Sequence, residues 1–87
     1  MKWKVIWQPS VEQQVASFWL NPAWRAELNQ VTAAIDRQLQ IDPFAVGESR
    51  LGDMRIMFEP PYGVYFFIHE PSLTVYVLRI WRYDSHI

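Results

Sequence analysis

Arginine and tyrosine side chains mark strand-like segments in the C-terminal third of the chain. Arg55 lies within residues 53–59, and Arg82 and Tyr83 end the segment 74–83. The arginine guanidinium binds phosphate through two parallel hydrogen bonds, and a tyrosine ring stacks on bases. An antiparallel sheet can bring the two segments side by side. We therefore expect these three residues to share one face, as a group that could grip or cleave RNA.

Cleavage of RNA through its 2′-hydroxyl requires a general base, a general acid and charge stabilisation at the phosphate. Glu48 and His86 are the candidates for base or acid, and Arg55 and Arg82 for the phosphate contact. Structural roles remain open beside these. Arg55 is equally consistent with a solvated strand face on which it pairs with Glu59, and His86 with a frayed chain end.

Composition limits the classes of protein that the chain can belong to. Its 87 residues predict one domain, and 51% of them are hydrophobic, which is enough for a core without disulfides or metals. Without cysteine, thiol catalysis and cysteine-ligated zinc are excluded, and the two histidines lack ligand spacing, so we expect neither metal nor cofactor. A net charge of −1 gives no general basic excess for nucleic acid.

The location of the protein follows from its hydrophobic runs. The N-terminus lacks an apolar stretch of signal-peptide length, and the run from Val64 to Ile68 is far shorter than the ~20 residues that span a bilayer. The sequence therefore predicts a soluble, cytoplasmic protein that does not enter a membrane.

Periodicity predicts an α+β fold of order β-α-α-β-β-β, with a helical hairpin on one face of an antiparallel sheet. Alternation indicates a strand at 2–7, and capping by Ser10 and Asn21 favours helices at 10–20 and 22–41. Strands follow at about 53–59, 64–69 and 74–81, the last apolar on both faces and hence central. The expected core is made of Val5, Val15, Leu28, Val31, Ile35, Leu39, Ile56, Val75 and Val77.

Over nearly its whole length the chain resembles the RelE/ParE superfamily of bacterial toxins from type II toxin–antitoxin systems. The resemblance rests on the opening strand 3–7, the helical pair, the segments 42–44 and 47–50, the strand around Arg55 and the ending 75–83. It implies either ribosome-dependent cleavage of messenger RNA or inhibition of DNA gyrase, and a bound antitoxin that keeps the toxin inactive. A silent binding module on the same scaffold is a third possibility.

The resemblance also assigns individual residues. Arg55 occupies the place of a frequent family arginine, and Arg82-Tyr83 resembles the end of an RNase subgroup, although the histidine is displaced to position 86. The arginine that RNA-cleaving members carry at the start of the third strand is missing, since Tyr62-Gly63-Val64 stands there. The candidate catalytic residues are Glu48, Arg50, Arg55, Arg82, Tyr83 and His86.

The five tryptophans provide a separate indication. Trp24 fits the apolar stripe of the long helix, but the other four are too many for so small a core to hide completely. We expect some of them to form an exposed apolar surface onto which an antitoxin segment folds.

Overall fold

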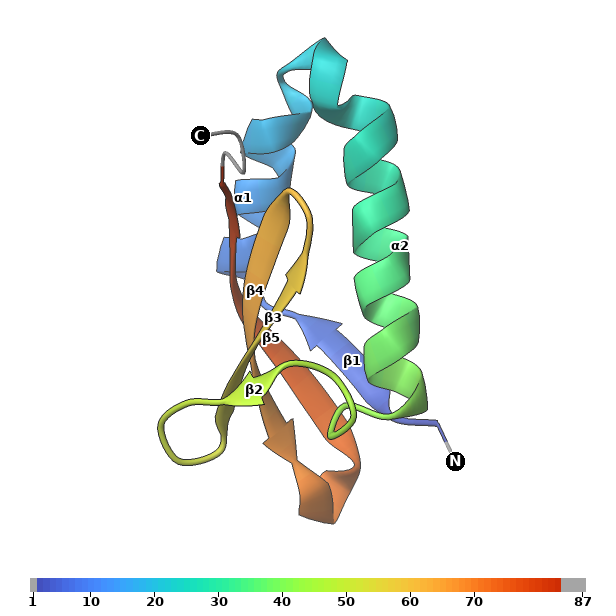
Figure 1. The fold of residues 1–87 in the computed structure, drawn as a ribbon. Coiled ribbons are helices and arrows are strands. Elements are labelled where there is room, and N and C mark those ends of the chain that lie inside the picture. Colours follow the sequence, from blue (N-terminus) through green and yellow to red (C-terminus); the bar gives the residue numbers. More distant parts are fainter. Residues whose placement is uncertain (1, 84–87) are drawn as a thin grey trace.

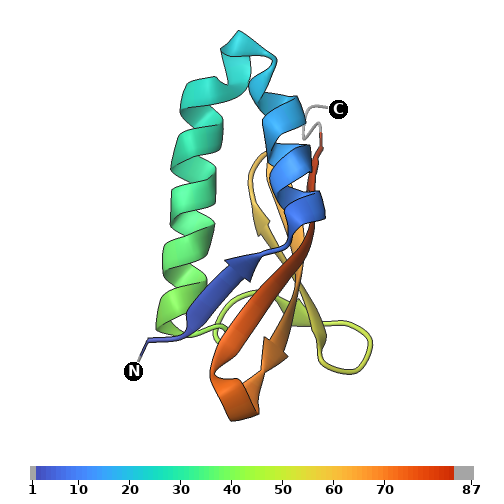
Figure 2. The same ribbon diagram turned by 180° about the vertical axis from the view of Figure 1, so that it is seen from behind.

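A five-stranded sheet with two helices on one of its faces forms the structure, a computed structural model that describes residues 2–83 (Figures 1 and 2). The elements follow the order β1, α1, α2, β2, β3, β4 and β5, with short 3₁₀ turns at Pro22–Trp24 and Glu70–Ser72. The predicted α+β class is confirmed. His86 lies outside the described residues.

The N-terminal half supplies one strand and both helices, β1 (Lys4–Trp7), α1 (Pro9–Trp19) and α2 (Arg25–Ile41). Asn21 caps the turn before α2 as predicted, because its side chain accepts a hydrogen bond from the amide of Ala23 at 3.0 Å. The predicted cap at Ser10 is wrong. Helix α1 begins one residue earlier, where proline's fixed φ suits a first helical position, and the cap residue Gln8 contributes no side-chain bond.

The C-terminal half supplies the remaining strands, β2 (Glu48–Ser49), β3 (Met54–Glu59), β4 (Tyr62–His69) and β5 (Thr74–Arg82). The order of strands in the sheet is β1-β5-β4-β3-β2. The last strand therefore has a neighbour on each side, which confirms that it is not an edge strand. Strands β3, β4 and β5 are antiparallel as expected, but β1 runs parallel to β5. The sheet is therefore mixed. Parallel neighbours need a long connection, and the chain between β1 and β5 is long enough to provide it. The short edge strand β2 lies between the predicted helix 22–41 and the predicted strand 53–59, where no strand was expected.

A β-bulge in β5 changes which of its side chains face the helices. Tyr65 pairs with Arg79 and Phe66 pairs with Val77, so Leu78 has no partner across the ladder. Before the bulge, Val77 faces the helices; after it, Ile80 and Arg82 do. The opposite, helix-free face of the sheet, which we call the open face, thereby receives Arg79 and Trp81, because one extra residue inverts the alternation.

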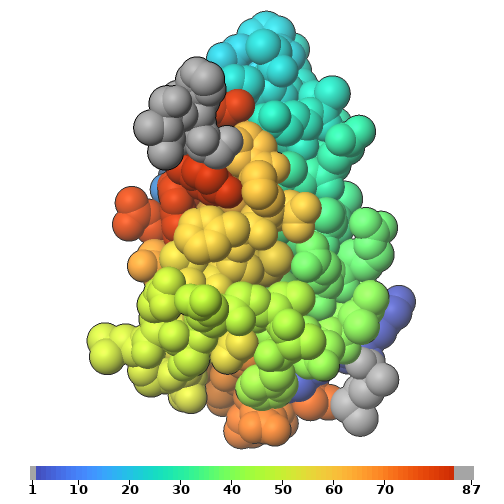
Figure 3. Space-filling view, in the orientation of Figure 1, coloured from blue at the N-terminus to red at the C-terminus, as the bar shows by residue number. Residues whose placement is uncertain are grey.

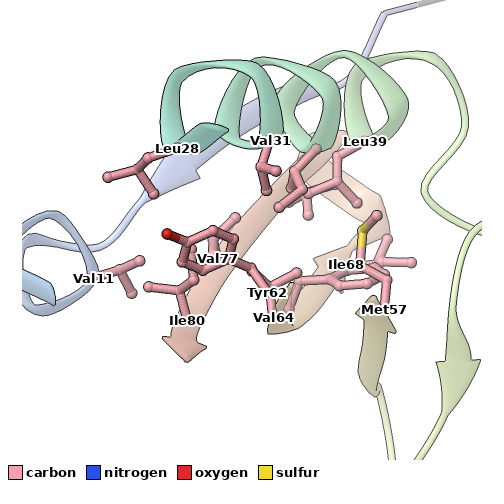
Figure 4. Packing of buried hydrophobic residues seen from close by; sticks show 13 residues of the cluster. Val11, Leu28, Val31, Leu39, Met57, Tyr62, Val64, Ile68, Val77 and Ile80 are labelled. Atoms are coloured by element: carbon pink, nitrogen blue, oxygen red, sulfur yellow. The ribbon is translucent and has the colours of Figure 1, made fainter. Parts of the chain in front are cut away.

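The core lies between the helix layer and the sheet (Figure 4). Seven of the nine predicted core residues are buried. Val5 and Val15 are only half-buried, because they line an open hollow of about 470 Å³ between α1, α2 and the edge strand β1. Strand β4 adds residues that periodicity had not singled out, notably Tyr62 and Phe66, both fully buried.

The middle of the α2 stripe gives the first prediction. Leu28 is 1% exposed and Ile35 is fully buried, so replacing either with alanine should lower the free energy of unfolding by about 2–5 kcal/mol. Urea denaturation measures the loss. Arg37→Ala on the exposed side of α2 is the control, with an expected change below about 0.5 kcal/mol. Equal effects of core and control substitutions would contradict the packing described here.

Candidate functional site

The sheet separates the predicted site residues onto its two faces. Arg55 pairs with Phe66 and Arg82 with Tyr62, and both partners point into the core, so both arginines lie on the helix side. Because those partners are four residues apart on β4, the two backbones are more than about 13 Å apart. Glu48, Arg50 and Tyr83 belong to the open face. The expected single group of Arg55, Arg82 and Tyr83 is therefore not formed.

Arg55 closes the loop between α2 and β2. Its Nη2 donates to three backbone carbonyl oxygens, those of Phe44, Val46 and Gly47, at 3.2 Å each. Its Nε is buried and has no hydrogen-bond partner within the described part of the chain. The predicted pairing with Glu59 is wrong, since the Glu59 carboxylate accepts from Nε2 of Gln38 at 2.8 Å. Arg55 thus holds a loop in place.

Arg82 joins the end of β5 to the start of α2. Its guanidinium carbon lies 4.2 Å from the ring centroid of Trp24, and Nη2 is 3.3 Å from Oε1 of Glu27. Burial by itself would lower the pKa of Arg82, but interactions with the Tyr62 phenol and the Glu27 carboxylate outweigh it and raise the pKa above its ordinary value. The charge of Arg82 is therefore permanent and already neutralised within the fold.

On the open face, one row of side chains crosses four strands. Glu48 pairs with Ile56, Ile56 with Tyr65, and Tyr65 with Arg79, and cross-strand partners point to the same side. Three strand spacings of ~4.8 Å put the ends of the row about 14 Å apart. Nη1 of Arg50 lies 3.1 Å from Oε2 of Glu48 in an exposed ion pair. A carboxylate and two arginines therefore flank an apolar centre.

Aromatic rings cover the rest of the open face. Trp81 contacts both Tyr65 and Phe58, with ring centroids 5.2 and 6.2 Å apart, and Phe58 contacts Tyr83 at 5.7 Å. Trp81 reaches Phe58 because Gly63 lies between them without a side chain. A Cβ at Gly63 would lie 2.5 Å from the Trp81 ring. The indole thus lies over the glycine of Tyr62-Gly63-Val64, the stretch in which the resemblance predicts a third-strand arginine.

A second hollow, of about 470 Å³, lies where β3 and β4 meet the loop before β3. Polar residues in its lining are Ser49, Asp53, Arg55, His69 and Glu70. Nδ1 of His69 is 2.6 Å from Oγ of Ser72, which orients the imidazole. Reasoning from sequence had considered His69 only as a metal ligand, and residues 2–83 hold no group of three His, Cys, Asp or Glu side chains that could bind a metal ion.

Sequence reasoning missed Arg79 of the open face as a candidate for function, and it considered Trp81 only as one of four tryptophans that could form a surface for the antitoxin. The signal for Arg79 was a lone charge inside an apolar strand, but its side of the sheet depends on the bulge. The exposed tryptophan surface that was expected is small. Among the tryptophans of residues 2–83 only Trp19 is exposed, at 37%, while Trp3 and Trp7 pack against the core.

The contrast between the two arginines of β5 is testable by stability. Arg82→Ala should lower the free energy of unfolding by about 1–2 kcal/mol, because it removes a cation–π contact and a partly exposed ion pair. Arg79→Ala, on the exposed open face, should change it by less than about 0.5 kcal/mol. Thermal and urea unfolding of the two variants check this, and the reverse order would place β5 in the wrong register.

The contact between Gly63 and Trp81 gives a further stability prediction. Gly63→Ala should cost about 1–3 kcal/mol, since the new methyl group displaces the indole. The same substitution in a Trp81→Ala background should cost clearly less, which a double-mutant cycle by urea unfolding measures. Additive costs would mean that the ring does not lie over Gly63.

No protein-family model and no curated protein matches the chain. Among solved structures, a chain of the toxin–antitoxin complex RelBE2 from Mycobacterium tuberculosis superposes with a TM-score of 0.79 at 19% identity, over 95% of this chain and 100% of that one. The isolated RelE toxin from E. coli gives 0.66 at 11% identity, over 97% and 87%.

A double arginine-to-alanine mutant of the E. coli toxin in the free state gives a similar TM-score, 0.67 at 11% identity, over 98% of this chain and 87% of that one. At sequence identities this low, the similarity shows a shared backbone fold and does not show a shared chemistry at the site. No helix among residues 2–83 is both long and apolar enough to cross a bilayer. The expectation from the resemblance is confirmed at the level of architecture: the chain has a RelE-like fold.

Proposed function

We propose that the chain is the toxin of a toxin–antitoxin pair, held inactive by a protein partner, and that it acts on messenger RNA at the ribosome. The proposal is supported by a RelE-like fold over 95% of the chain, matched in a structure that contains an antitoxin. Under this proposal the protein works in the cytoplasm, where ribosomes are. The ribosome and the messenger RNA are the remaining partners.

The cross-strand row of the open face carries the proposal. Glu48 is its acid–base group and takes the proton of the attacking 2′-hydroxyl. Arg50 and Arg79 are its phosphate ligands, and they contact different nucleotides because the row is about 14 Å long. Tyr83, whose ring packs on Phe58, positions a base. His86 remains a candidate for the acid that protonates the leaving oxygen.

Arg55 and Arg82 keep a place in the proposal as residues that hold the site rather than touch the phosphate. Arg55 fixes the loop that leads into Glu48, through its bonds to Phe44, Val46 and Gly47. Arg82 fixes the end of β5, and Tyr83 follows directly. Substituting either should reduce activity through the position of its neighbour and should lower stability as well.

Induced expression in bacteria tests the function. The parent should arrest growth and cut messenger RNA on ribosomes, and co-expression with a cognate antitoxin should restore growth. Glu48→Gln should lower the cleavage rate about 10²- to 10⁴-fold, the usual contribution of general base catalysis. Glu12→Gln, at an exposed position on α1, is the matched control and should retain the parental rate. Primer extension on messenger RNA from translating extracts provides the measurement.

The rival functions predict other results in the same cells. Growth arrest with relaxed plasmid DNA and intact messenger RNA would indicate a gyrase inhibitor and overturn the RNA proposal. A protein that leaves growth unchanged at high expression and still binds a partner would be a silent binding module. Full cleavage by Glu48→Gln would remove that residue from the site while leaving the toxin function in place.

A further inference from the structure

A small hollow on the open face, of about 260 Å³, is lined by Tyr65, Arg79 and Trp81. Figure 3 shows the whole molecule in space-filling form, in the orientation of Figure 1. The bulge in β5 makes the hollow, because Arg79 and Trp81 face this side only after the extra residue Leu78. Gly63 completes it by allowing the indole to lie across β4. Two aromatic rings and a guanidinium group thus line the hollow.

The spacing within the hollow suits one planar ring at one place. The rings of Tyr65 and Trp81 touch, with centroids 5.2 Å apart, so nothing enters between them. The guanidinium carbon of Arg79 lies 5.9 Å from the Trp81 centroid. Bases stack about 3.4 Å apart, so a ring held between two planar groups needs about 6.8 Å. Arg79 is exposed, and an outward shift of ~1 Å provides that space.

We propose that Trp81 and Arg79 form a stacking subsite for one nucleobase of single-stranded RNA, with Tyr65 as its side wall. Aromatic faces and arginine bind bases of any sequence through stacking and cation–π contacts, and the same guanidinium reaches the adjoining phosphate. The subsite names the ligand of the open face and so rests on the proposed function. The subsite also lies beside the start of the third strand, Tyr62-Gly63-Val64, where the resemblance predicts an arginine and where this chain has an indole over the glycine.

Binding to uncleavable RNA tests the subsite apart from toxicity. The probe is a fluorescein-labelled hexamer of 2′-O-methyl adenylate, which lacks the 2′-hydroxyl needed for cleavage, followed by fluorescence anisotropy at low salt. Trp81→Ala should weaken binding roughly five- to a hundredfold, the usual effect of losing one stacking partner. Trp81→Phe keeps a ring and should stay within about threefold of the parent. Trp19→Ala, an exposed tryptophan on α1, is the matched control and should bind as the parent does.

An abasic hexamer with the same phosphates separates stacking from charge. The parent should lose at least as much affinity on removal of the bases as it loses through Trp81→Ala. Trp81→Ala should distinguish the two hexamers clearly less than the parent does, because only the base contact of Tyr83 remains. Arg79→Gln should weaken both hexamers and make the salt dependence of binding shallower by about one ion. If Trp81→Ala fails to fold, Arg79→Gln and the comparison of hexamers on the parent still test the subsite, because equal binding of both hexamers by the parent would overturn it.

Equal binding of the parent to both hexamers would overturn the subsite, as would unchanged binding by Trp81→Ala. A Trp81→Ala variant that keeps its RNA affinity and loses affinity for the antitoxin would show a protein-docking face instead. Failure of the proposed function is distinguishable from these outcomes. A parent that binds the intact hexamer through Trp81 and cuts no messenger RNA on ribosomes keeps the subsite and loses the enzyme.

Discussion

One extra residue in β5 determines the chemistry of both faces of the sheet. Leu78 has no partner on β4, so the side chains after it exchange sides relative to those before it. Ile80 and Arg82 are directed at the helices, and Arg79 and Trp81 at the open face. A strand of regular alternation would bury Arg79 and Trp81 and expose Ile80. The core and the candidate site therefore depend on the same local irregularity.

The two faces use their arginines in different ways. On the helix side, Arg55 donates to three carbonyl oxygens, and Arg82 contacts an indole and a carboxylate. Both guanidinium groups therefore have their partners within the protein. On the open face, Arg79 is exposed above Trp81, and Arg50 shares an exposed ion pair with Glu48. A net charge of −1 is thus compatible with a nucleic-acid surface, because the cations that matter are those left exposed on one face.

The open face also differs in kind from the site that the resemblance predicts. The start of the third strand, Tyr62-Gly63-Val64, carries no arginine, and the indole of Trp81 lies over its glycine. An indole stacks on a base but cannot neutralise a phosphate. Compared with the site that the resemblance predicts, the open face therefore has one charge fewer for phosphate and one ring more for stacking. Under our proposals, Glu48 and the exposed arginines supply the chemistry and the aromatic rings hold the substrate.

The sequence alone determined the elements whose side chains repeat with a clear period. The stripe of α2 from Leu28 to Leu39 has one buried side, and Asn21 and Asp42-Pro43 mark where helices begin or end, so fold class and most of the core were predictable. Strand β5 is apolar on both sides and has no period that reveals its facing. Arg82 and Tyr83 lie on opposite faces because adjacent residues of an extended chain alternate, which local geometry already requires. The bulge and the parallel partner β1, by contrast, were decided by pairing between distant segments, where the packing of whole layers outweighs local pattern.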